Sequence, residues 1–279
     1  MMNTEAMIID AHVHFWNYDK KRDAWMDAMP VLQQDHLPAG LENILFQNGV
    51  AACVAVQAAQ SESETLFLSE LAEKNPFIKG VVGWVDLRNI NIEERLEYFS
   101  ARPVIKGWRH ICQGEAAGFL LREDFLYGIK ALEAYGYTYD VLIGRHQLEE
   151  TLKFVTRFPG QKFVVDHCAK PAVATGEIKD WAVWMKELAR HPGVYCKFSG
   201  LLTEARWHNW KVADIYPYFD TVVEAFGCRR ILFGSDWPVL NAAGNYKQWK
   251  DLLLQYLSSF SQQEQQHILC NNTIEFYSL

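Results

Sequence analysis

Short runs of consecutive apolar residues recur along the chain, and each run is followed by a polar or glycine-containing break. The runs do not alternate between apolar and polar positions, which is typical of parallel strands that are covered on both faces. The segments between them repeat apolar residues at helical intervals, and a glycine at the end of the helical pattern precedes several runs. We therefore predict eight strands, at residues 7–15, 51–57, 78–87, 104–111, 137–143, 162–168, 194–200 and 230–238.

Helical patterns fill the gaps between these strands, and the first of them opens with the spacing of a capping box, from Ser61 to Glu64. Eight strands that alternate with helices, without a linker or low-complexity segment, predict an α/β protein with a single domain over residues 1–279, a (β/α)8 TIM barrel. An open doubly wound sheet is the alternative, but no G-x-G-x-x-G follows the first strand. The predicted helical segments are 61–75, 92–99, 122–136, 147–155, 180–189, 218–226 and the tail 258–279.

Composition narrows the range of partners. The net charge is −7 and no block of like charges is present, which argues against a nucleic-acid surface. The longest apolar run, VAACVAV, is too short to span a bilayer, and the opening MMNTEAMIID lacks the pattern of a signal peptide. The six cysteines form no C-x-x-C and predict reduced core residues of a cytoplasmic protein. We therefore expect a small-molecule substrate, neither nucleic acid nor membrane as partner, and leave a homo-oligomer open.

Ionisable side chains gather at the carboxyl ends of the predicted strands, where barrel enzymes place their chemistry. Each such group would cost a few kcal/mol if it were buried without a partner. Packing alone does not require this pattern on six different strands, so we expect an active site at this rim. The polar residues at the strand ends are His12, His14, Arg109, His110, Asp140, Asp166, His167, Lys170, Lys197, Ser199, Ser235 and Asp236.

His12 and His14 are separated by one residue, so within a strand they share a face and can converge on one metal ion or one substrate oxygen. His167 is a candidate third metal ligand, proton carrier or hydrogen-bond donor. Asp236, where the last apolar run stops, is a candidate metal ligand and general base. The alternatives are surface histidines, a satisfied buried histidine and a capping aspartate.

Further candidates for binding substrate lie on the neighbouring strands. Arg109 and His110 could grip an anionic or hydroxylated substrate, and salt bridges to neighbouring carboxylates are the alternative. Asp140 and Lys197 are candidates too, with an ion pair between them as the alternative. Trp108 could form part of a stacking wall, for which core packing is the alternative.

Two long stretches, residues 15–48 and 201–218, are expected to cover the active site, because long βα loops of barrels tend to do so. The sequence lacks the motifs of several other kinds of site. There is no G-x-S-x-G, no P-loop, and no Cys/His spacing of a structural zinc site.

Six motifs, taken together, resemble the amidohydrolase superfamily, more narrowly its amidohydrolase-2 branch and the sugar-lactonase-like group within it (L-fuconolactonase and L-rhamnonolactonase). The resemblance runs from residue 8 to the carboxyl end. The motifs are DAHVHFW, KGWRH, VVDHCAKP, KFSGLLTEA, FGSDWPV and the closing ILCNNTIEFYSL.

The resemblance implies a TIM barrel and hydrolysis of a cyclic ester, with His12, His14, His167 and Asp236 as the active-site constellation. It implies either one divalent ion, with zinc as the first choice, or catalysis without metal. A two-metal site does not fit, since the fifth and sixth strands offer one clear histidine instead of two further ligands. The alternatives are a metal-dependent decarboxylase, which would use the same residues, and a metabolite-binding pseudoenzyme.

Overall fold

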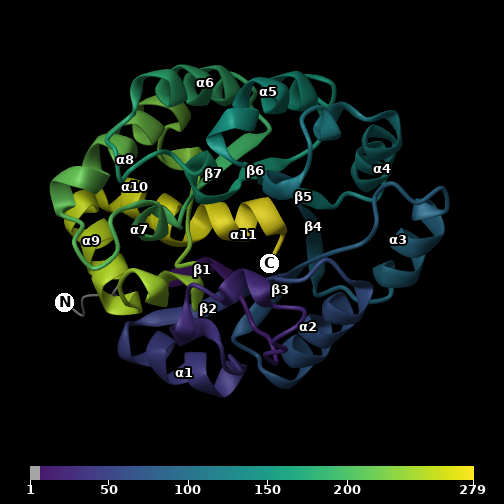
Figure 1. Ribbon diagram of the computed structural model, residues 1–279, viewed down its shortest axis with the longest axis horizontal. Helices are drawn as coiled ribbons and strands as arrows, with labels where there is room; N and C mark the ends of the chain where they lie inside the picture. Colours follow the sequence, from purple (N-terminus) through teal and green to yellow (C-terminus); the bar gives the residue numbers. More distant parts are fainter. Residues whose placement is uncertain (1–6) are drawn as a thin grey trace.

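The structure, a computed structural model that describes residues 7–279, is built around eight parallel strands that pair in sequential order (Figure 1). Residues 1–6, part of the segment for which no signal peptide is predicted, lie outside the described residues. All eight predicted strands are present, and the predicted (β/α)8 barrel is confirmed. The strands are β1 (Ile8–Val13), β2 (Val50–Val56), β3 (Ile78–Gly83), β4 (Ile105–Ile111), β5 (Thr138–Leu142), β6 (Phe163–Val165), β7 (Val194–Phe198) and β8 (Ile231–Phe233).

The first and last strands come together at their carboxyl ends and nearly close the barrel. The backbone N–H of His14 donates to the carbonyl of Trp237 over 2.7 Å, and that of Asp236 donates to the carbonyl of His12 over 2.9 Å. The buried carboxylate of Asp10 accepts the N–H groups of His12 and Ser235 at 3.0 and 2.9 Å. These bonds fix the ends of β1 and β8 side by side.

Helices surround the strands as an outer layer (Figure 1). The predicted helical segments are found, and α8 begins six residues earlier than its apolar pattern indicates. The helices are α1 (Pro38–Gln47), α2 (Glu62–Lys74), α3 (Ile92–Ser100), α4 (Glu123–Ala134), α5 (Leu148–Thr156), α6 (Lys179–Ala189), α7 (Leu201–Glu204), α8 (Val212–Phe226), α9 (Tyr246–Leu257), α10 (Gln262–Gln266) and α11 (Asn272–Tyr277).

Only one of the two hydrogen bonds of the predicted capping box at α2 is formed. Ser61 Oγ accepts the N–H of Glu64 over 3.2 Å, as expected of the N-cap residue. The carboxylate of Glu64 instead accepts the N–H groups of Ala58 and Ala59 at 2.5 and 2.6 Å. Glu64 therefore stabilises the turn that leaves β2, next to the rim where the site lies.

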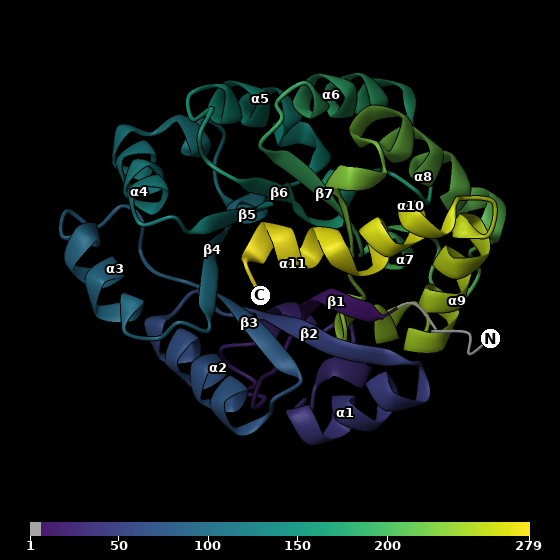
Figure 2. The same cartoon turned by 180° about the vertical axis from the view of Figure 1, so that it is seen from behind.

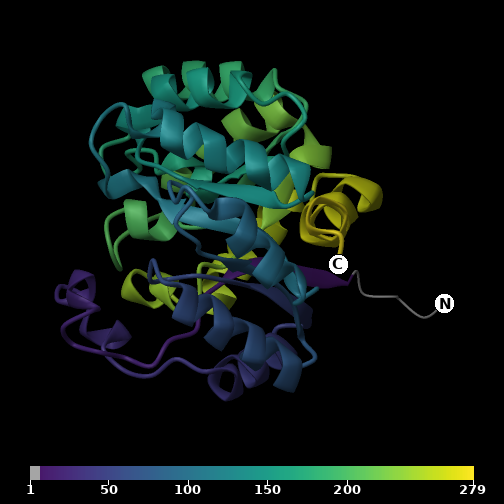
Figure 3. The ribbon, with the colours of Figure 1, turned by 90° about the vertical axis from the view of Figure 1, so that its right-hand side faces the viewer.

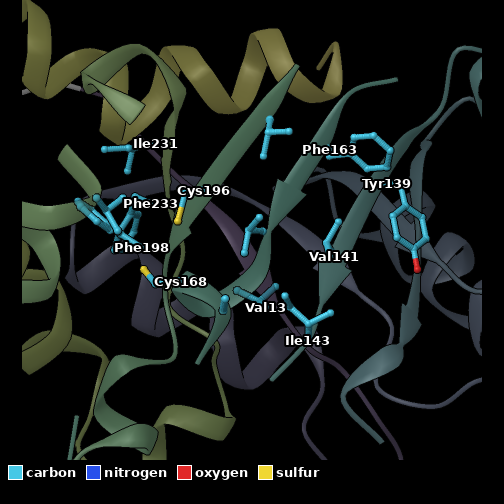
Figure 4. Close-up of a cluster of buried hydrophobic side chains, with 14 of the residues drawn as sticks. Val13, Tyr139, Val141, Ile143, Phe163, Cys168, Cys196, Phe198, Ile231 and Phe233 are labelled. Carbon is cyan, nitrogen blue, oxygen red and sulfur yellow. The ribbon is translucent and has the colours of Figure 1, made fainter. Parts of the chain in front are cut away.

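The larger part of the core lies between the strands and the helices. Figure 4 shows side chains of this layer, among them Tyr139 and Val141 on β5, Phe163 on β6, and Phe198 on β7. All four are almost completely buried. Successive side chains of a strand point to opposite faces. The alternate residues of each strand, such as Asp140 between Tyr139 and Val141, therefore point into the barrel.

The amino-terminal end of the barrel is filled by the last helix. The predicted helical tail is divided into α10, a π-helical turn (His267–Asn271) and α11. Phe276 and Tyr277 of α11 pack against small apolar side chains inside the barrel. Figures 2 and 3 show α11 lying across this end, and the long segment between β1 and α1 at the opposite end. A ligand can therefore enter from the carboxyl ends of the strands.

All six cysteines have free thiols, five of them buried, as the sequence predicts. Within residues 7–279, the helices are too short or too polar for any of them to traverse a bilayer.

Candidate active site

The side chains of His12, His14, His167 and Asp236 meet at the carboxyl ends of β1, β6 and β8. Asp236 Oδ1 lies 3.2 Å from His14 Nε2, 3.8 Å from His12 Nε2 and 3.9 Å from His167 Nε2. The Nε2 atoms of His12 and His14 are 3.1 Å apart. The structure thus brings the four predicted residues to one point at one rim of the barrel.

Two of these residues, His167 and Asp236, have an unusual backbone conformation. His167 and Asp236 have φ values of +52° and +62°, in the left-handed region that non-glycine residues seldom adopt. The predicted strands 162–168 and 230–238 therefore end earlier, at Val165 and Phe233, because the chain turns sharply there. Each turn directs its side chain inward over the end of the barrel.

Hydrogen bonds to the Nδ1 atoms orient the rings of His14 and His167. His14 Nδ1 lies 2.7 Å from the carbonyl oxygen of Val56, which can only accept, so this nitrogen donates. His167 Nδ1 lies 2.8 Å from Ser199 Oγ. In both rings the Nε2 atom is left to face Asp236.

Burial and charge set the protonation of the site. Burial works against ionisation of Asp236, but the neighbouring imidazoles, His167 foremost, prevail and hold the pKa of Asp236 below its usual range. Burial lowers the pKa of His167 to about 4, although the charge of Asp236 opposes this change. At neutral pH Asp236 is therefore an ionised base beside a neutral His167.

A layer of charged groups lies directly beneath the histidines. Lys197 Nζ is within 2.5 Å of Asp140 Oδ2 and 3.1 Å of Asp166 Oδ1, and also 3.1 Å from His12 Nδ1. Lys197, Asp140 and Asp166 are fully buried. Burial disfavours ionisation of Asp166, but Lys197 prevails and holds its pKa well below its usual range. The ion pair named as an alternative for Asp140 and Lys197 is what the structure shows, and neither residue lines the cavity described below.

We expect Lys197→Met to lower the free energy of unfolding by about 3–5 kcal/mol, because it leaves the buried carboxylate of Asp140 without its cation and that of Asp166 with Arg109 alone. Urea unfolding of the variant and of the unchanged protein measures this difference. Lys186→Met is the matched control, since Lys186 forms an exposed ion pair with Glu224 and should hardly change stability. Equal losses in the two variants would contradict a structural role of the buried charge layer.

A cavity of about 270 Å3 lies above the cluster, with His14, His167 and Asp236 in its lining. The sequence predicted Arg109 as a substrate-binding residue, and its side chain also lines this cavity. The residues that line it without having been predicted as site residues are Trp25, Ala58, Ile111, Gln113, Leu142, Lys170 and Val239. Trp25 comes from the predicted covering stretch 15–48, whereas residues 201–218 do not reach this cavity.

Two of the predicted substrate-binding residues lie elsewhere. The indole of Trp108 is fully buried and packs edge-on against Phe99 and Tyr137 in the outer core. His110 is buried as well, and its Nε2 lies 2.8 Å from Glu115 Oε1. Since Arg109 points into the barrel, its two neighbours must point outward, and a substrate contact does not fit their positions.

The four site residues fit a single divalent ion. His14 Nδ1 donates to Val56, so in the neutral ring Nε2 is an acceptor that faces another acceptor, Asp236 Oδ1, at 3.2 Å. Such a contact calls for a proton or a cation between the two atoms. Nitrogen and oxygen ligands bound to zinc at about 2.0–2.2 Å in a tetrahedron lie about 3.3–3.5 Å apart, close to the distances in this cluster. His12, His167 and Asp236 also meet the spacing of a metal site.

Comparisons with known proteins identify the family of this chain. A family model described as Amidohydrolase matches residues 9–279. An L-fucono-1,5-lactonase of Burkholderia multivorans is 38% identical over 266 residues, which cover 91% of this chain and 90% of that protein. A crystal structure of an amidohydrolase from Burkholderia multivorans with bound HEPES has a TM-score of 0.94 at 36% identity, over 98% of this chain and 100% of that one. A second crystal form, with bound zinc, has a TM-score of 0.93.

Proposed function

Because this chain belongs to the amidohydrolase family, we propose that it hydrolyses the ring ester of a sugar-acid lactone of the L-fucono- or L-rhamnono-lactone type. The observation that carries the proposal is the position of an ionised Asp236 among three imidazoles at the floor of a small cavity. A volume of about 270 Å3 is below the usual range for drug-sized ligands and suits a single sugar ring. The 38% identical relative is named as a lactonase of this class.

Asp236 acts as the general base in this proposal. Its carboxylate takes a proton from a water molecule, whose oxygen adds to the lactone carbonyl carbon. The tetrahedral intermediate then collapses, the ring C–O bond breaks, and Asp236 returns the proton to the departing ring oxygen. His14 and His167 flank Asp236 and fix the position of its carboxylate at the floor of the cavity.

Zinc is the metal we propose for this cluster, held by the Nε2 atoms of His12, His14 and His167 and by Asp236 Oδ1. When bound, such an ion polarises a carbonyl group. The guanidinium of Arg109 borders the same cluster, with Nη1 at 3.3 Å from His12 Nε2. Arg109 therefore places a permanent positive charge beside the histidine cluster, whether or not a metal ion is bound.

A proton-release assay on L-fucono-1,5-lactone and L-rhamnono-lactone tests the function. We expect one proton released for each ring opened and no carbon dioxide, because water attacks an ester and no carboxyl group leaves. The same assay distinguishes the decarboxylase alternative, which predicts carbon dioxide. Binding of lactone without any turnover would support the pseudoenzyme alternative and contradict the proposal.

We expect zinc to bind with one ion per chain, and His14→Ala to weaken this binding at least tenfold, since it removes one of four ligand atoms. Isothermal titration calorimetry of the metal-free protein measures both quantities. His110→Ala is the control, because His110 lies outside the cluster and should leave zinc affinity unchanged. Two ions per chain, or equal affinity in the two variants, would contradict this ligand set.

A further inference from the structure

Lys170 lies on the wall of the catalytic cavity, at the end of an unusual turn. Residues 167–170 have φ values of +52°, +51°, +57° and +50°, and none of them is glycine. The left-handed conformation costs about 1–2 kcal/mol for each such residue. Strain of this kind persists where the surrounding structure enforces it, and it is concentrated at functional sites.

Specific contacts enforce the turn. The N–H of Lys170 donates to the carbonyl of His167 over 2.8 Å, and the indole N–H of Trp181 donates to the carbonyl of Cys168 over 2.7 Å. Cys168 and Ala169, the two middle residues of the turn, are fully buried. As a result, His167 and Lys170, three residues apart, both reach the cavity.

The ammonium of Lys170 is held near the cavity by a modest ion pair. Its Nζ lies 2.9 Å from Oε1 of Glu204, the last residue of α7, and both side chains are 26% exposed. Partly exposed pairs of this kind contribute little to stability, so a ligand can replace one of them at small cost. The ammonium has three N–H bonds, and Glu204 accepts one of them.

Arg109, the other cation among the described residues that line this cavity, is bound more tightly by the protein. It is buried, and its two terminal nitrogens donate to the carbonyl of Gln57 and to Asp166 Oδ2. The ammonium of Lys170 donates to Glu204 alone among the described residues, so it is more readily available than Arg109 to stabilise a negative charge that develops on the substrate during the reaction.

We propose that Lys170 hydrogen-bonds the lactone carbonyl oxygen as it becomes negative, and then holds the carboxylate of the aldonate product; this rests on the lactonase function proposed above. When water adds to the carbonyl carbon and its proton passes to Asp236, the carbonyl π electrons move to the oxygen that Lys170 contacts. They return as the ring C–O bond breaks and the ring oxygen takes the proton from Asp236. Lys170 keeps its protons, and the new carboxylic acid loses its own to solvent.

A donor that acts on developing charge stabilises the transition state more than the neutral substrate. We therefore expect Lys170→Met to lower kcat about 100-fold, with KM changed less than threefold. L-fuconate is the aldonate that hydrolysis of L-fucono-1,5-lactone produces. Its dissociation constant, measured by calorimetry, should rise at least tenfold in Lys170→Met. Lys170→Arg should restore part of kcat, and Glu204→Gln should tighten L-fuconate binding, because it frees the ammonium from its partner.

Lys179→Met, which removes an exposed lysine of α6, serves as the control and should leave kcat and L-fuconate binding unchanged. Circular dichroism establishes that the variants are folded. If the unchanged protein hydrolyses the lactone and Lys170→Met retains its kcat and its affinity for L-fuconate, the role of Lys170 is wrong and the lactonase function stands. If the unchanged protein neither hydrolyses the lactone nor binds L-fuconate, both are wrong.

Discussion

Asp236→Asn is expected to lower kcat on a sugar lactone by about 1,000-fold or more, within the range for loss of a general base. The amide cannot take a proton from water, whereas the carboxylate is held ionised by its imidazole neighbours. The side chain keeps its size, so the fold should be unchanged. Proton release under saturating lactone, together with far-UV circular dichroism, measures both effects.

Asp180→Asn provides the matched control, since Asp180 is exposed on α6 and outside the site. It makes the same change of charge and should retain the full rate. A near-normal rate for Asp236→Asn on the true substrate would show that another group activates the water.

Gly200→Ala should lower kcat more than 100-fold, although Gly200 contacts no reacting atom. A Cβ atom at this position would lie 2.6 Å from Cγ and Nδ1 of His167, so the ring has to move. Small misplacements of catalytic groups can cost about 100-fold in rate. Steady-state kinetics of the purified variant measures this loss.

Gly49→Ala separates this effect from backbone strain. Gly49 has the same φ, +67°, and a Cβ atom there would meet no atom within 4 Å. Both variants should lose about 1–2 kcal/mol of unfolding free energy from the left-handed conformation, and Gly200→Ala should lose more because its Cβ atom collides with His167. Only Gly200→Ala should lose activity, and similar rates in the two variants would mean that the position of His167 is not critical.

The barrel and the centre of its site could be predicted because each rests on local patterns. Continuous apolar runs separated by helical periodicity fix the order of the strands, and parallel strands bring their carboxyl ends to one rim. The spacing of His12 and His14 then places both rings on one face. This is why four residues distant in sequence could be expected to meet.

The parts that sequence reasoning missed depend on tertiary contacts or on the alternation of strand faces. The left-handed turn after Val165 contains no glycine, so local rules extend the strand to Cys168, whereas the Trp181 indole stabilises the turn. Trp25 lies in a short 3-10 helix (Ala24–Met26), within a segment whose sequence shows no periodicity. Trp108, in contrast, could have been excluded, since adjacent positions of a strand cannot both face the barrel interior.

Attack by an Asp236-activated water on the acyl carbon of a sugar lactone can be measured in water enriched in oxygen-18. With L-fucono-1,5-lactone as substrate and Asp236→Asn as the background, we expect one heavy oxygen in the carboxylate of the product and none in its new hydroxyl group. Three results would contradict attack by an Asp236-activated water on the acyl carbon. They are conversion by the unchanged protein no faster than by Asp236→Asn, heavy oxygen in the new hydroxyl group, and release of carbon dioxide.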